Sequence, residues 1–146
     1  LGGGYHGVHR TVAPLCGTVM QDLANTAQGR WYFGTAQNED PHLALVHDNV
    51  DPTLGAFSVG TSIPSLPPGV YTFTPAATGR VNADFSRVTA DGNIYCYEGL
   101  GFVFSGHILV QMPSATTLKI VGVAGASCGT DPTAWSLGGG AVQFGR

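Results

Sequence analysis

Short runs in which apolar positions alternate with small or polar ones recur along the chain from residue 30 onward. Successive side chains of a β-strand point to opposite faces, so this alternation is typical of strands with one buried face. The runs are rich in β-branched and aromatic residues and are bounded by Gly, Pro, Asn and Asp. The pattern predicts strands at residues 30–34, 42–47, 55–59, 69–74, 93–98, 100–104, 106–112 and 116–123, with a last candidate at 141–144.

Tight turns separate these runs. Pro68-Gly69 and Asp91-Gly92 are strong turn signals, and residues 112–117 are expected to close a hairpin. Many short strands joined by tight turns, with no helix spaced between them, favour an antiparallel architecture. We therefore expect an all-β fold, a single antiparallel β-barrel or sandwich of about eight short strands with little helix.

The first 28 residues differ from the rest. They are Gly-rich at the start, and residues 18–27 are a candidate short helix; residues 82–88 are a candidate for a single helical turn. We expect an N-terminal extension over residues 1–28 and an antiparallel β-barrel domain over residues 29–146. Because the chain begins at Leu1 and not at Met, we interpret it as a domain cut from a longer protein.

Strand alternation also predicts the core. Residues two apart share a face, so each strand contributes a pair of large side chains to the interior. The expected core pairs are Trp31 with Phe33, Leu43 with Leu45, Phe57 with Val59, Tyr71 with Phe73, and Leu118 with Ile120.

The composition of the chain limits the kinds of partner that we expect it to bind. Only 10% of the residues are charged, the net charge is -3 and Lys119 is the single lysine. Soluble domains have about 25% charged residues. This thin charge predicts neither a nucleic-acid partner nor an anionic membrane partner. No apolar run approaches the roughly 20 residues that a transmembrane helix needs, so membrane insertion is not expected.

The three cysteines bear on location. Cys16, Cys96 and Cys128 allow at most one internal disulfide, whose pairing the spacing leaves open, although a bridged Cys128 is the favoured interpretation. None belongs to a C-x-x-C motif. A single bridge in a lysine-poor chain rich in Thr and Gly predicts an extracytoplasmic protein, secreted or periplasmic.

The run HLALVHDNVDP, residues 42–52, gathers two histidines and two aspartates. His42 and His47 are five residues apart, so on one regular strand they point to opposite faces and do not share a metal. Asp48 and Asp51 then have the character of a turn. A strand that runs into a turn is the favoured interpretation, ahead of a metal site.

A second histidine pair lies near the N-terminus. His6 and His9 have an H-x-x-H spacing that can offer two imidazoles to zinc or copper. A third ligand must come from elsewhere, with Asp40, His42 and His107 as candidates. An ordinary solvated segment is the favoured alternative, and no cofactor is expected.

Catalytic motifs are not evident. There is no G-x-S-x-G, and Glu98 is the one acid expected at the exit of a strand, where a solvated rim residue is commoner than a general acid. Aromatic side chains can line a pocket or fill a small core, and the core is the favoured interpretation for most of them. A ligand pocket, if one exists, is expected at the mouth of the barrel. The expected ligand-binding residues are Trp31, His47, Tyr95, Tyr97 and Gln111.

At GRWYFG, residues 29–34, the chain resembles the G-x-W opening of lipocalin and avidin-like (calycin) barrels, with Gly29 and Trp31 at the matching positions. The resemblance implies a second marker, an Arg packed on the Trp from a late strand, for which Lys119 and Arg146 are the candidates. Residues 27–98 also resemble uncharacterised C-terminal accessory β-domains of secreted bacterial proteins. Such domains can follow a metallopeptidase-like module and have no established activity of their own.

The leading hypothesis is a non-catalytic extracytoplasmic β-domain that acts as a binding or accessory module and holds a small ligand at a barrel mouth, with a small molecule or a protein as partner. The first alternative is a self-associating surface or assembly protein, because little charge keeps subunits apart. The second alternative is a metal-dependent enzyme that uses His6 and His9.

Overall fold

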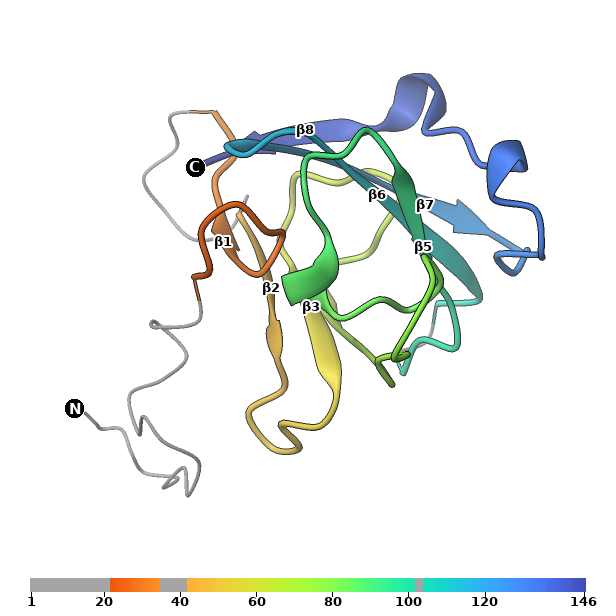
Figure 1. The fold of residues 1–146 in the computed structure, drawn as a ribbon, viewed down its shortest axis with the longest axis horizontal. Helices are drawn as coiled ribbons and strands as arrows, with labels where there is room; N and C mark the ends of the chain where they lie inside the picture. The colour runs from red at the N-terminus through yellow and green to blue at the C-terminus, as the bar shows by residue number, and fades with distance from the viewer. Residues whose placement is uncertain (1–21, 35–41, 102–103) are drawn as a thin grey trace.

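The computed structural model describes residues 22–34, 42–101 and 104–146, which form two four-stranded antiparallel sheets (Figure 1). The first sheet contains β1 (Gly29–Trp31), β2 (Leu43–His47), β3 (Gly55–Val59) and β4 (Gly69–Phe73). The second sheet contains β5 (Ile94–Tyr97), β6 (Gly106–Ser114), β7 (Thr117–Ala124) and β8 (Val142–Gly145). Three short 3₁₀ helices complete the described part: η2 (Phe85–Arg87), η3 (Pro132–Ala134) and η4 (Gly138–Gly140). The expected all-β fold is confirmed.

The two sheets form an open sandwich, which is one of the two architectures expected, and do not form a closed barrel. At one side β1 meets β8 through a single bridge, in which Tyr32 N donates to Gly145 O and Gly145 N donates to Tyr32 O. At the other side β4 and β5 do not pair. Arg80 and Asn82 occupy the free edge of β5 by bonding the backbone of Cys96, which leaves β4 no edge to join.

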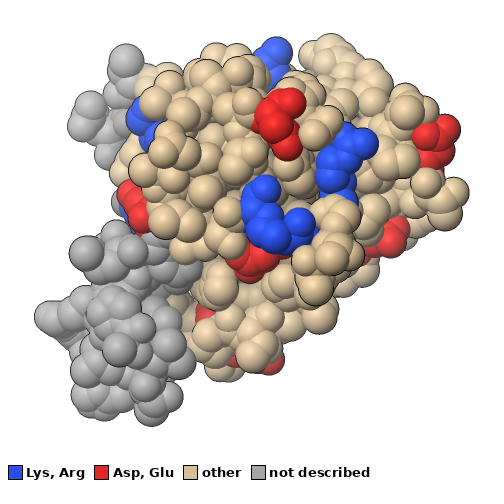
Figure 2. Space-filling model, viewed as in Figure 1, with Lys and Arg blue, Asp and Glu red and all other residues tan. Residues whose placement is uncertain are grey.

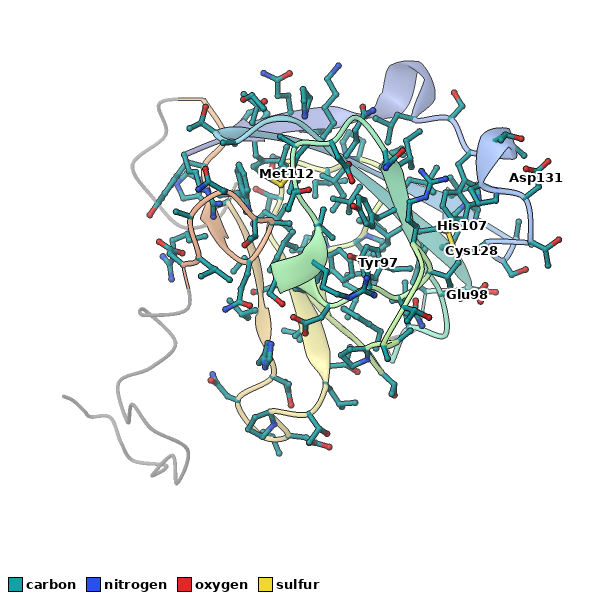
Figure 3. All side chains as sticks on the ribbon, in the orientation of Figure 1. Tyr97, Glu98, His107, Met112, Cys128 and Asp131 are labelled. Atoms are coloured by element: carbon teal, nitrogen blue, oxygen red, sulfur yellow. A yellow bond between two sulfur atoms is a disulfide. The ribbon has the colours of Figure 1, made fainter. Side chains whose placement is uncertain are left out.

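Aromatic side chains fill the space between the sheets. Phe57 and Phe73 of the first sheet contact Tyr97 of β5 with ring centroids 5.0 and 4.8 Å apart, and Phe85 of η2 packs on all three. Tyr97 lies in the interior of the molecule in Figure 3. Such edge-to-face contacts stabilise beyond the area they bury. The sandwich therefore has a solid interior rather than a ligand cavity.

Four of the five expected core pairs are confirmed, since both members are buried. In the fifth pair Trp31 is fully buried, but Phe33 is 40% exposed. Strand β1 ends at Trp31, so the alternation of a regular strand no longer sets the direction of Phe33.

Two expected elements are not found as predicted. The described residues of the predicted strand at 100–104 are not part of a sheet ladder; Gly101 instead packs against β4, where its N–H donates to Thr72 O at 2.8 Å. The candidate helix at 18–27 forms a turn over its described residues, 22–27, because Asn25 has φ +67°. The predicted turn at 82–88 contains η2.

The outer face of the second sheet is covered by the chain itself. Residues 125–141 cross it, and Trp135 and Leu137 pack on Leu109 and Val121. The disulfide between Cys96 of β5 and Cys128 fixes this covering segment to the sheet. None of the helices in the described ranges has the length and apolarity that a membrane crossing requires.

Candidate functional site

The outer face of the first sheet carries its shortest side chains on its two middle strands. The strand register places Ala44 of β2 between Arg30 of β1 and Ser58 of β3. In the next row Val46 lies opposite Ala56. A sheet is hollowed where its central side chains are shorter than those of its flanks, so this face forms a trough.

The trough has a volume of about 650 Å³ at its deeper end and 330 Å³ at the other. The two hollows share Arg30, Ala44 and Ser58, so they are continuous. Five strand residues extend roughly 17 Å, which sets its length. We call this trough the outer groove; its deeper end is lined by Asp22, Arg30, Tyr32, Ala44, Val46, His47, Asp48, Asn49, Ala56, Ser58 and Val70.

Tyr32 is the aromatic side chain of the groove wall. Its ring is 42% exposed and meets the ring of His42 edge to face, with centroids 4.8 Å apart. Both backbone groups of Tyr32 bond Gly145, and His42 Nδ1 accepts from Phe33 N at 3.2 Å. An exposed aromatic ring held in this way is preorganised for contact.

His47 closes one end of the groove through a polar chain. Its Nδ1 lies 3.1 Å from Pro52 O and its Nε2 lies 3.2 Å from Asp84 Oδ1. Asp84 Oδ2 accepts hydrogen bonds from the N–H and hydroxyl of Ser86. These contacts join the β2–β3 turn to η2 and orient the imidazole.

The groove carries little net charge. Among the described residues that line it, Arg30 is the one full cation, and Asp22 and Asp48 are the acids. Asp22 Oδ1 accepts from Arg30 N at 2.7 Å, and Asp48 Oδ2 accepts from Asp51 N at 2.9 Å. Figure 2 shows that most of the surface in view is uncharged, with few Lys, Arg, Asp and Glu side chains. Polyanions are not favoured by such a site.

The predicted strand-then-turn interpretation of residues 42–52 is confirmed. β2 ends at His47, and Asp48 and Asp51 accept bonds from the backbone of their own turn. His42 and His47 make separate contacts, as their odd spacing predicts. Among the described residues no group of three His, Cys, Asp or Glu side chains could hold a metal ion. His6 and His9 lie outside the described residues, so their metal role stays a prediction.

The five predicted ligand-binding residues are not brought together. His47 alone lines the outer groove. Trp31 and Tyr97 are fully buried in the interior. Tyr95 donates to Asp91 Oδ2 at 2.7 Å, and Gln111 Nε2 donates to Gly92 O at 2.9 Å, so both support the turn before β5.

Trp31 has a structural environment that the G-x-W motif explains. The guanidinium of Arg146 lies 4.3 Å from the centre of its ring, and Trp31 Nε1 donates to Ala27 O at 2.9 Å. Arg146 also donates to the carbonyls of Leu23, Thr26 and Gln28. Burial lowers the pKa of Arg146, against the opposing effect of Asp22.

Gly29 is required by this arrangement. Its φ is +133°, and a Cβ there would lie 2.4 Å from Asp22 Oδ1 and 3.0 Å from Arg146 Nη1. The motif therefore pins the turn at residues 22–28 and the end of β8 to the same end of the sandwich.

A separate hollow, of about 490 Å³, lies near the disulfide and is polar. Glu98 Oε1 accepts from Cys128 N at 2.8 Å, and the Asn82 amide bonds both backbone groups of Glu98. His107 Nδ1 lies 2.9 Å from Ala126 O. Figure 3 shows Glu98, His107 and Cys128 at this end of the molecule. Their hydrogen bonds hold the covering segment, which gives Glu98 a structural role.

Comparison with known proteins gives no match: no family model, curated protein or solved structure matches this chain. The outer groove was not predicted from the sequence. Alternation over 43–47 and 55–59 predicts which residues form the core, and it does not by itself show that the opposite, outward positions form a groove. Those outward positions are Ala44, Val46, Ala56 and Ser58. The outward face of a solvated strand usually carries charged or polar residues. Short uncharged residues at these positions are therefore the sequence signal that could have indicated the groove.

Proposed function

We propose that the protein is a non-catalytic binding module that takes its ligand in the outer groove. The observation that carries this proposal is the floor of short, uncharged side chains on an exposed face, walled by an oriented tyrosine. Contiguous exposed apolar surface is typical of interaction sites. Of the large hydrophobic residues that are exposed in the described part, Tyr32 and Val70 line this groove.

The chemistry of the groove supports binding over catalysis. Both ring nitrogens of His47 face other groups of the fold, Pro52 O and Asp84, and Nδ1 of His42, the second imidazole of the groove, accepts from Phe33 N. A base for a serine or water nucleophile needs a ring nitrogen directed at that nucleophile. The hydrogen bonds of His47 at the end of the groove thus fix the position of its side chain and have a structural role.

The Cys96–Cys128 bridge supports an extracytoplasmic location, secreted or periplasmic, since such bonds persist in oxidising compartments. The stacking of Arg146 on Trp31 supports the proposed likeness to calycins at the G-x-W strand. The sandwich is open and its interior is filled, so the ligand site we propose lies on the outside of a sheet. An accessory role beside another module agrees with a groove that faces outward.

A panel of immobilised glycans, peptides and small molecules tests the proposal with two matched variants. Ser58→Arg fills the groove floor, and Gln143→Arg places the same side chain on an exposed outward position of β8. We expect a ligand that binds the wild type and Gln143→Arg but not Ser58→Arg. Binding that survives Ser58→Arg, turnover of a bound compound, or a panel without any ligand would contradict it.

The exposed hydrophobic residues around the first sheet favour one second candidate, self-association through this face. Sedimentation of the wild type and Ser58→Arg separates the two functions. A dimer of the wild type that Ser58→Arg dissociates would favour assembly and would count against a ligand groove, whereas a monomer in both proteins favours binding.

A further inference from the structure

The groove differs from a general hydrophobic patch in how its apolar and polar groups are distributed. Methyl groups of Ala44, Val46 and Ala56 form the floor, while polar side chains stand at its margins. The ligand that fits must therefore present C–H groups downward and hydrogen-bonding groups sideways.

An extended peptide does not meet this requirement when it lies on the face of a sheet. Its N–H and C=O groups would lie over the methyl floor, and unpaired backbone groups are costly when they are buried. A lipid tail also fits poorly, since the groove is open and its margins carry Arg30, Asp48 and Asn49. A polyanion also fits poorly, because the charged residues that line the groove are two acids and one arginine.

A pyranose ring has the complementary distribution, with C–H groups on its faces and hydroxyl groups around its perimeter. The aromatic face is electron-rich, so it attracts the polarised C–H groups of such a ring. Tyr32 supplies an aromatic ring on the groove wall, and its contact with His42 restricts its motion. Asn49 and Asp48 supply amide and carboxylate groups at the margins, and Ser58 supplies a hydroxyl group in the floor.

We infer that the outer groove binds an uncharged oligosaccharide chain, lying along β2 and β3 with one sugar against Tyr32. This inference rests on the proposed binding function and names its ligand class. The continuity of the two hollows through Arg30, Ala44 and Ser58 admits a linear chain of several sugars, longer than a single monosaccharide.

Titration calorimetry with cellohexaose, chitohexaose and maltohexaose tests the inference, with oligogalacturonate and an extended-peptide pool as contrasts. We expect at least one of the uncharged hexaoses to bind, and to bind more tightly than oligogalacturonate. Tyr32→Ala should weaken binding about tenfold, as expected for loss of an aromatic contact, whereas Tyr32→Phe should stay within about threefold. Ser58→Arg should abolish binding.

Phe33→Ala is the matched control, because Phe33 is exposed to a similar extent as Tyr32 but is absent from the groove lining. It should leave the affinity unchanged, and thermal unfolding of each variant verifies the fold. Three results would overturn the inference. If a peptide or oligogalacturonate binds best and Ser58→Arg abolishes that binding, the ligand class is wrong and the proposed function survives. If Tyr32→Ala has no effect on hexaose binding, the assigned contact is wrong. If no ligand responds to Ser58→Arg, the inference and the proposed function both fail.

Discussion

The outer faces of the two sheets of this sandwich differ in the size of their side chains. The middle strands of the second sheet carry Leu109 and Val121 outward, and residues 125–141 cover them. The corresponding strands of the first sheet carry Ala44, Ala56 and Ser58, and this face is hollowed and open. Large apolar side chains must be covered, whereas short ones carry little apolar area that needs a covering segment. Outward side-chain size thus separates a face that stabilises the fold from a face that is available for a ligand.

The largest expected effect on stability comes from removing the disulfide that fixes residues 125–141 to the second sheet. Cys96 and Cys128 are 32 residues apart, and a loop of that size is expected to stabilise by about 3–4 kcal/mol through restriction of the unfolded chain. The double variant Cys96→Ala/Cys128→Ala should lose this much in urea unfolding. Stability equal to the oxidised wild type would show that the covering segment is held by packing alone. At a temperature where the variant stays folded, ligand binding by the first sheet should be unchanged.

A smaller loss is expected for the aromatic side chain of the covering segment. Trp135 is partly buried against the second sheet, and its Nε1 donates to Cys128 O at 2.7 Å. Trp135→Ala should cost about 2 kcal/mol, less than the 3–5 kcal/mol of a fully buried aromatic. The matched variant Tyr32→Ala, on the open face, should cost under about 1 kcal/mol. Urea midpoints measure both. Equal losses would remove the distinction between the two faces.

Two tyrosines of β5 test whether the interior is a solid core and not a ligand site. Among the described residues the buried Tyr97 hydroxyl has no hydrogen-bond partner, whereas the Tyr95 hydroxyl donates to Asp91. Tyr97→Phe should be neutral or stabilising, and Tyr95→Phe should cost about 1 kcal/mol, because only the second removes a hydrogen bond. Denaturant unfolding compares them. A loss of ligand affinity in Tyr97→Phe would place the ligand inside the sandwich and contradict the outer groove.

The smallest effect is expected in alkaline solution. Burial raises the pKa of Tyr97 well above 10.0, and the nearby Asp84 and Tyr95 raise it further. Above about pH 10 the unfolded chain releases this proton while the folded chain keeps it, so the free energy of unfolding falls as pH rises. Tyr97→Phe should flatten this decline in urea unfolding at increasing pH. An unchanged slope in the variant would show that Tyr97 is not the responsible group.

Much of the sandwich could be predicted from alternation. The pairs Leu43 with Leu45 and Phe57 with Val59 are inward as expected, because one buried face fixes the period of a strand. The open sandwich could not be predicted, since it depends on Asn82 bonding the edge of β5 across a long loop. The stacking of Arg146 on Trp31 spans most of the chain, so local pattern does not predict it; the resemblance to G-x-W barrels had given Arg146 as one of two candidates.

The candidate site was less predictable than the fold. Aromatic residues were expected to line a pocket, yet Trp31 and Tyr97 serve the core, because large apolar area is most stabilising when it is fully buried. Of the five expected residues, His47 lines the outer groove, which is not the barrel mouth where the five were expected. Small side chains, Ala44 and Ser58, form part of the groove floor. They are neighbours because the register of β2 and β3 places them opposite each other.

Mapping of backbone amide shifts by nuclear magnetic resonance, during titration with the oligosaccharide that binds best, tests the central claim most directly. The account predicts saturable shifts at Tyr32, Ala44 and Ser58, with the amides of Leu109 and Val121 unmoved. Shifts confined to the second sheet or to the interior, or no saturable shift at all, would contradict the assignment of the open face as the binding site.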